Sequence, residues 1–277
     1  MDKKEFSDKF DTLLNSYKTS VPYGYEQGNF DFTLNEYEKS IYLTQAQEAF
    51  VRGYFTSATD IDATFEGSEN ARKSIEALVY DAVLESSETL NLRQHIVKGS
   101  KFFSLEKDAN NVPLDVWFVI YESLVYETSE EDDIKKPNSC VYDNVDAKGW
   151  GYTISIPITH DDFYRTYNNP FRGVTNRRAL RLTAGEKLYE VVSKYDIDKY
   201  FIRYVKRPEP IILENLPDGL TINGKDEPND PVCVLDESLH DIILSNAVQL
   251  ALQYHSLTTG KVPVPQQTSS KKDDDKD

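Results

Sequence analysis

The sequence predicts an α+β fold in which the terminal helices pack together as a helical bundle, with a β-rich middle region that projects as an insertion. Apolar residues recur at helical spacing near both ends of the chain. Runs of aromatic and β-branched residues, typical of strands, lie between them. These strands do not alternate with long helices, so a parallel α/β sheet is not expected.

Three helical segments are expected in the N-terminal part of the chain. The first has an apolar stripe over residues 6–17 with i, i+4, i+7, i+8, i+11 spacing. The second is expected at about Asn35–Phe55, where Thr33 and Glu36 have the spacing of a capping box. The third is expected at about Ser68–Tyr80, which carries apolar residues on one side.

The middle of the chain contains the expected strands. An acidic stretch, Glu127–Pro137, is expected to form a solvated loop between two of them. Further on, Thr159–Asp162 can begin a short helix that reaches about Tyr167. The expected strands are Lys101–Leu105, Val116–Tyr126, Gly151–Ile158, Arg178–Leu182, Leu188–Ser193 and Tyr200–Lys206.

The chain after the last strand has three distinct parts. Arg207–Pro210 contains two prolines, which remove hydrogen-bond donors, so this segment is expected to be an extended arm or a sheet edge. Thr221–Lys225 contains an Asn-Gly pair, a strong hairpin signal. Asp236 is expected to cap a final amphipathic helix.

These elements predict a domain organisation with a split helical region. Residues 1–80 form its first part, and the C-terminal helix at residues 235–256 completes it. Residues 81–234 form the β-rich middle region with the extended arm. Residues 257–277, rich in Lys and Asp, are expected to be a disordered tail.

Charge and composition exclude several classes of protein. The chain has 277 residues, with 31 Lys and Arg against 47 Asp and Glu, and a formal net charge of −16. This charge argues against general affinity for nucleic acid or anionic membranes. No apolar segment predicts a signal peptide or a membrane-spanning helix. The two cysteines, Cys140 and Cys233, provide no disulfide framework and fit a reducing compartment.

The sequence contains no motif that carries a known chemistry. Phosphate-binding glycine loops and the GxSxG pattern are absent from the sequence. The four histidines lack metal-binding spacing, and the compact group His160–Asp162 is more simply a helix start. The chain is therefore not expected to be an enzyme, and no catalytic, metal-binding or cofactor-binding residue and no cofactor are predicted.

One basic segment stands out in this acidic chain. Residues 163–182 contain five arginines and no acid, so the segment carries +5 and the rest of the chain −21. Arginine makes bidentate contacts with carboxylates, so docking to an acidic partner or a neighbouring acidic subunit is expected. Pairing with the chain's own acids is the main alternative, and a nucleic-acid backbone is a third. The arm after the last strand is a second docking candidate, or alternatively a linker between domains. The candidate docking residues are Arg165, Arg172, Arg177, Arg178, Arg181, Pro208, Pro210, Ile211 and Ile212.

Five blocks in order over about residues 30–255 carry a resemblance: Leu34–Glu48, Pro157–Asp162, Asn169–Arg172 with Arg177–Arg178, Ile202–Leu213, and Leu235–Leu244 with Ala247–Val248. This ordered set resembles a structural protein family of crAss-like phages and related tailed phages of gut Bacteroidetes. Members of that family look like neck or ring proteins of the head-to-tail connector.

The resemblance implies a structural virion protein of the neck or tail that resides in the host cytoplasm before assembly. It implies a homo-oligomeric, dodecameric ring that bridges portal and tail, with the portal protein and other connector or tail ring proteins as partners. DNA would pass through the channel without specific binding, and no membrane is involved. A tail or baseplate component is the alternative structural role. A virion-associated enzyme and a non-virion assembly factor are the alternatives from other classes.

Overall fold

The computed structural model describes residues 1–19, 33–56, 73–86, 96–97, 99–127, 150–217 and 219–259. The chain divides into two compact units. The helical unit combines Met1–Ala77 with Pro208–Asp277, and the sheet unit is Leu78–Arg207. Most of the predicted acidic loop, Glu127–Pro137, and of the predicted tail, 257–277, lies outside the described residues.

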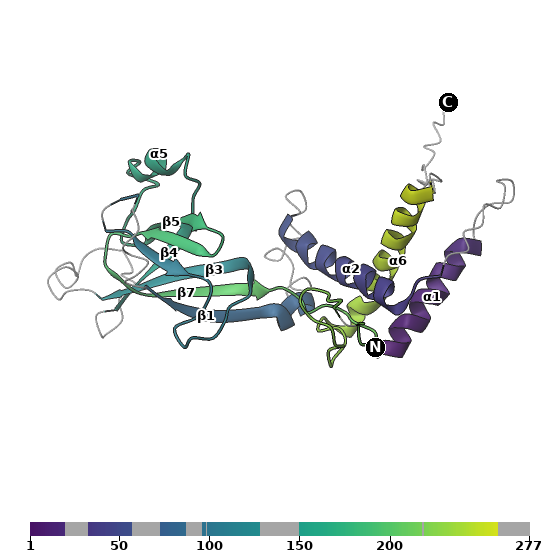
Figure 1. The fold of residues 1–277 in the computed structure, drawn as a ribbon. Helices are drawn as coiled ribbons and strands as arrows, with labels where there is room; N and C mark the ends of the chain where they lie inside the picture. Colours follow the sequence, from purple (N-terminus) through teal and green to yellow (C-terminus); the bar gives the residue numbers. More distant parts are fainter. Residues whose placement is uncertain are drawn as a thin grey trace, which may run out of the picture. The chain divides into compact units, whose positions relative to one another are not determined.

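The sheet unit is built on a single seven-stranded sheet (Figure 1). The strand order is β1-β7-β3-β4-β5-β6-β2. All neighbouring strands are antiparallel except β4 and β5, which are parallel. The strands are β1 (Val79–Glu85), β2 (Lys101–Ser104), β3 (Val116–Glu127), β4 (Trp150–Pro157), β5 (Arg178–Gly185), β6 (Leu188–Val192) and β7 (Ile197–Lys206).

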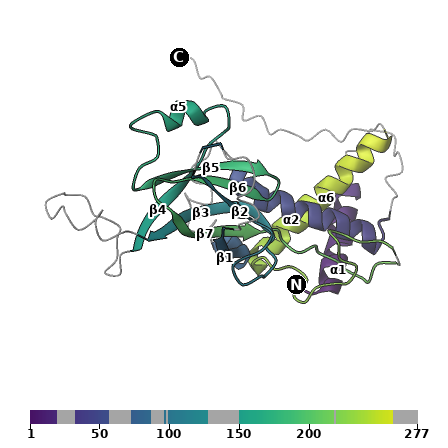
Figure 2. The ribbon, with the colours of Figure 1, turned by 60° about the vertical axis from the view of Figure 1, so that its left-hand side comes forward.

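The sheet curls so that its two edge strands, β1 and β2, approach each other (Figure 2). Ser86, directly after β1, forms an antiparallel bridge with Phe103 of β2. Successive residues of a strand point to opposite faces, so Tyr200 and Ile202 of β7 lie inside the curl and Phe201 lies outside. The inner face is filled by apolar side chains that include Leu84, Phe103, Leu124, Ala179, Tyr189, Val191, Tyr200 and Ile202.

The predicted helix at Ser68–Tyr80 is wrong in its C-terminal part. A single 3₁₀ turn, η2 (Glu76–Leu78), leads directly into β1, a strand that the sequence analysis missed. Within β1, Ala82 and Leu84 are buried and their immediate neighbours are more exposed, which is the alternation of a strand. β1 pairs along its whole length with β7, and this pairing overrides the local helical pattern.

The helical unit contains α1 (Lys3–Thr19), α2 (Glu36–Thr56) and α6 (Glu237–Thr259). α1 and α2 each pack more extensively on α6 than on each other. None of the helices in the described ranges is long and apolar enough to cross a membrane. The side chains buried in this unit include Phe6, Phe10, Leu14, Leu43, Ala46, Val51, Ile243, Leu244, Ala247 and Val248.

The predicted fold class is wrong. The sequence analysis expected an α+β protein with its terminal helices packed together as a helical bundle and a β-rich middle region inserted between them. Over the described residues a curled seven-stranded sheet dominates, and α2 is covered partly by extended backbone instead of a further helix. An apolar stripe predicts a helix, but it does not specify whether a helix or extended backbone covers that stripe. The apolar stripes were therefore not sufficient evidence for a helical bundle.

The start of α2 shows a capping box that is shifted from its predicted place. The side chain of Asn35 accepts a hydrogen bond from the backbone N–H of Glu38 at 2.8 Å. The carboxylate of Glu38 in turn accepts one from the N–H of Asn35 at 2.9 Å. The reciprocal motif is therefore formed by this pair and not by Thr33 and Glu36, two residues earlier.

Two other local predictions are confirmed. Asp236 accepts a hydrogen bond from the backbone N–H of Ser238 at 2.9 Å, at the start of α6. The Asn-Gly pair forms the predicted tight turn, since Asn223 and Gly224 have φ values of 51° and 80°. The flanking residues Ile222 and Lys225 form an antiparallel bridge across that turn.

Candidate functional site

The arginine-bearing segment forms a loop on the outer face of the sheet. We call residues 158–177, between β4 and β5, the arginine loop. It contains the short helix α5 (Phe163–Tyr167), which lies on the β5 side of the sheet (Figure 2). Phe163 is fully buried against Leu180 and Leu182 of β5 and Val192 of β6. This small apolar cluster anchors the loop on the sheet.

The tip of the arginine loop exposes an aromatic side chain on a fixed backbone. The side chain of Phe171 is 86% exposed. The side-chain oxygen of Asn169 accepts hydrogen bonds from the backbone N–H groups of Phe171 at 2.9 Å and Arg172 at 3.3 Å. The guanidinium of Arg178 donates to the carbonyl oxygen of Phe171 at 2.7 Å. The backbone that carries the Phe171 side chain is therefore held by the loop itself.

Gly173 closes this turn because no larger residue fits there. A Cβ atom at Gly173 would lie 2.7 Å from the carbonyl oxygen of Tyr167 and 2.8 Å from that of Asn169. Both are backbone atoms, so neither can rotate away. The N–H of Gly173 donates to the carbonyl oxygen of Asn169 at 2.7 Å, which tightens the turn below the tip.

The structure places the five predicted docking arginines in three environments. Arg165, Arg172 and Arg177 lie exposed on the arginine loop, whereas Arg178 is half-buried and supports the tip. Arg181 lies in β5 with its side chain directed to the inside of the curled sheet, as expected from strand alternation. Arg181 is therefore paired with an acid of its own chain, which was the alternative to docking.

The partner of Arg181 is a buried carboxylate. The Nε atom of Arg181 lies 2.9 Å from the carboxylate of Glu122 in β3, and its guanidinium carbon lies 4.1 Å from the ring centroid of Tyr189. The hydroxyl of Tyr200 donates to the same carboxylate at 2.5 Å. Burial, together with the nearby charge of Glu122, raises the pKa of Tyr200 well above its usual value.

The second set of candidates, in the arm, is buried in the helical unit. Pro208, Pro210, Ile211 and Ile212 are all buried. The backbone around them docks on α2: the hydroxyl of Thr44 accepts a hydrogen bond from the N–H of Ile211 at 3.1 Å. One turn earlier, the hydroxyl of Ser40 accepts one from the N–H of Leu213 at 3.0 Å. The arm thus supplies part of the interior of this unit.

Sequence reasoning missed an uncovered apolar area on the outer face of the sheet. Tyr121, Ile154, Ile156 and Phe201 are each more than one-third exposed, and we call these four residues the uncovered face. Strand register places Phe201, Ser123 and Ile154 in one row across β7, β3 and β4. The signal was present in the sequence, because these strands carry apolar residues at both odd and even positions.

Another part of the outer face, over β5 and β6, is covered by the chain itself. The arginine loop covers β5 and β6 through Phe163. Ile96 also packs there, and its N–H donates to the carboxylate of Glu190 at 2.7 Å. The hydroxyl of Ser100 donates to the same carboxylate. The outer side of β5 and β6 is thus covered, whereas no described residue covers the uncovered face.

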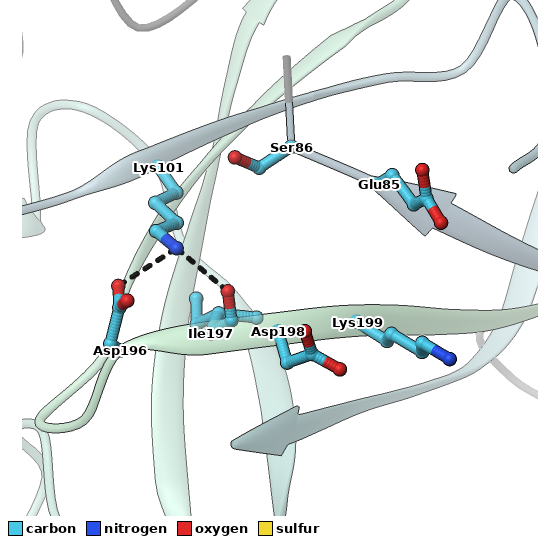
Figure 3. Close-up of a pocket in the computed structure, with 7 residues that line it drawn as sticks. All are labelled: Glu85, Ser86, Lys101, Asp196, Ile197, Asp198 and Lys199. Atoms are coloured by element: carbon cyan, nitrogen blue, oxygen red, sulfur yellow. Dashed lines mark hydrogen bonds and ion pairs between the residues drawn. The ribbon is translucent and has the colours of Figure 1, made fainter. Parts of the chain in front are cut away.

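A polar cavity of about 460 Å³ lies near the ends of β1, β2 and β7 (Figure 3). One of its two lysines, Lys101, lies 2.8 Å from both the carboxylate of Asp196 and the carbonyl oxygen of Ile197. Lys101 is thus already paired inside the unit. No group of three or more His, Cys, Asp or Glu residues within the described ranges is arranged to hold a metal ion. The lining residues are Glu85, Ser86, Lys101, Asp196, Ile197, Asp198 and Lys199.

Sequence comparison identifies the protein class to which this arrangement belongs. The family described as phage tail ring protein 3/4 matches residues 1–262, which span both units. The chain belongs to this family. The resemblance noted from the five sequence blocks and the assignment as a structural ring protein of a phage virion are thereby confirmed.

Two relatives within this family come from one phage. The chain is 37% identical over 261 residues to ring protein 3 of Bacteroides phage crAss001, covering 94% of this chain and 99% of that protein. It is 28% identical over 262 residues to ring protein 4/5 of the same phage, covering 91% of this chain and 92% of that protein. The similarity therefore extends over nearly the whole of this tail ring protein.

Proposed function

We propose that this tail ring protein forms a closed homo-oligomeric ring in the head-to-tail connector, where it bridges portal and tail. The ring is dodecameric, so that its symmetry matches that of the portal. The family match over residues 1–262 is the observation that carries this proposal. The protein works by assembly and not by catalysis, and it resides in the host cytoplasm before it joins the particle.

The charge of the chain suits passage of DNA through such a ring. A formal net charge of −16 disfavours contacts with phosphates, which would otherwise hold the DNA in the channel. The exposed arginines of the arginine loop then serve protein contacts, because an acidic neighbouring subunit or connector protein is a suitable counterpart. Arg165, Arg172 and Arg177 are the residues we assign to this role.

Copy number in the particle tests the proposed function directly. Quantitative mass spectrometry of purified virions gives the number of copies of this protein for each portal subunit. A ratio near one supports a portal-matched ring. Absence from the virion, or a ratio that fits no ring, would contradict the proposed function. An enzyme or an assembly factor would then be the better hypothesis.

Charge reversal on the arginine loop should block assembly without unfolding the protein. The double variant Arg172→Glu/Arg177→Glu is expected to reduce incorporation by about tenfold or more, because like charges would face an acidic partner. Incorporation is measured as copies per portal, and folding by thermal unfolding of the purified chain. The control Lys107→Glu/Lys187→Glu makes the same charge change at exposed sites outside the loop. Equal incorporation of the two variants would contradict the docking role.

A further inference from the structure

The sheet unit carries two surfaces that no described residue of the same copy covers. One is the tip of the arginine loop, where Phe171 is exposed on a fixed backbone. The other is the uncovered face, formed by β3, β4 and β7. The first is a projecting aromatic side chain with arginines beside it, and the second is an apolar sheet surface.

The tip has the composition of an interface anchor. Tyr164 and Tyr167 are exposed on the same loop, and Arg172 follows Phe171 directly. Aromatic residues and arginine dominate the energetics of protein interfaces. The hydrogen bonds of Asn169 fix the backbone of the tip before any partner arrives, so little conformational entropy is lost on binding.

The uncovered face is suited to receive such an anchor. Phe201 and Ile154 lie in one row and offer apolar area to a phenylalanine ring. Tyr121 is half-exposed in the same area, and a tyrosine ring attracts a guanidinium placed over it. Two basic side chains of β7 flank Phe201 on this face, Lys199 and Arg203. Lys199 lies opposite Glu85 of β1, and Arg203 is held by Asp81 at 2.7 Å, so each has a carboxylate of β1 beside it.

We propose that Phe171 of one copy packs on the uncovered face of a neighbouring copy. This inference rests on the proposed function, in which copies of this chain form a closed ring. In such a ring each contact joins one surface of a copy to a different surface of the next copy. Every copy therefore carries both of the surfaces that form the contact. The charge distribution favours the same partner, because the chain outside residues 163–182 carries −21 and attracts the basic loop of the next copy.

Site-specific cross-linking tests this contact in the assembled particle. A photoreactive phenylalanine analogue replaces Phe171 in the full chain, and virions containing it are irradiated and analysed by mass spectrometry. Mixed isotope-labelled and unlabelled subunits separate cross-links between copies from those within one copy. We expect cross-links between copies from position 171 to β3, β4 or β7. The same analogue at Val112, which is also exposed and has its N–H held by Asp108 at 2.7 Å, is the control.

The outcomes separate this inference from the function on which it rests. If the wild-type protein is absent from virions or lacks ring stoichiometry, the proposed function fails. If the stoichiometry is that of a ring but position 171 cross-links to another protein, to other strands, or to nothing, only the inference is overturned. In parallel, Phe171→Ala should lower incorporation by about tenfold or more, whereas Val112→Ala should leave it unchanged. Thermal unfolding of both variants should match the wild type, since both side chains are exposed.

Discussion

Replacing Arg181 with methionine is expected to lower the free energy of unfolding by about 3–5 kcal/mol. The side chain of Arg181 is 11% exposed and that of Glu122 is 6% exposed, so the variant leaves a buried carboxylate without its positive partner. The hydroxyl of Tyr200 still donates to Glu122, but one neutral donor does not replace a guanidinium. Urea unfolding of the purified chain measures the loss.

The matched control is a second, exposed arginine–carboxylate pair of the sheet. Arg203 and Asp81 are 55% and 70% exposed, so Arg203→Met should cost no more than about 1 kcal/mol. A double variant, Glu122→Leu/Arg181→Met, removes both buried charges and should recover much of the lost stability. If Arg181→Met and Arg203→Met were equally mild, Arg181 would not be part of a buried pair, and its side chain would be available to a partner.

Replacing Ile211 with alanine is expected to lower the free energy of unfolding by about 2–5 kcal/mol. Ile211 is fully buried in the helical unit, and its backbone is bound to Thr44 of α2, so the surrounding structure cannot easily collapse into the space left behind. Chemical denaturation of the full chain measures this effect.

The control for Ile211 is an exposed aliphatic residue of the same unit. Leu220→Ala should change stability by less than about 0.5 kcal/mol, because the side chain of Leu220 is more than one-third exposed. The result also decides between two roles for the arm. If Ile211→Ala kept its stability but lowered the number of copies per portal, the segment would be a docking arm and not part of the interior.

Local chemistry in the sequence predicted much of the secondary structure. The Asp236 cap and the Asn223–Gly224 turn depend on neighbouring residues alone, and both are present. β1 was missed because its partner strand, β7, lies more than a hundred residues away in the sequence. The covering of α2 by the arm was missed for the same reason. The hydrogen bond from the N–H of Leu213 to the hydroxyl of Ser40, for example, joins segments that are distant in the sequence.

The candidate site was only partly accessible to sequence reasoning. The concentration of arginines marked the segment, but nothing in the composition separates Arg181 from Arg177. That separation depends on strand alternation and on which face of the sheet curls inward, both of which are tertiary properties. Phe163 and Phe171 likewise look equivalent in the sequence, yet one anchors the loop and the other is its exposed tip.

The split helical unit has a consequence for synthesis of the chain on the ribosome. The sheet unit is complete once residue 207 has emerged, whereas α1 and α2 still lack the arm and α6, which cover them. The strands that begin and end the sheet unit lie side by side, with Val79 opposite Val205. Folding of the sheet therefore brings residues 79 and 205 together. This shortens the effective loop between the two chain segments of the helical unit, and with it the entropy cost of their association. The middle of the chain thus folds first, and the first helices to be made are among the last to find their partners.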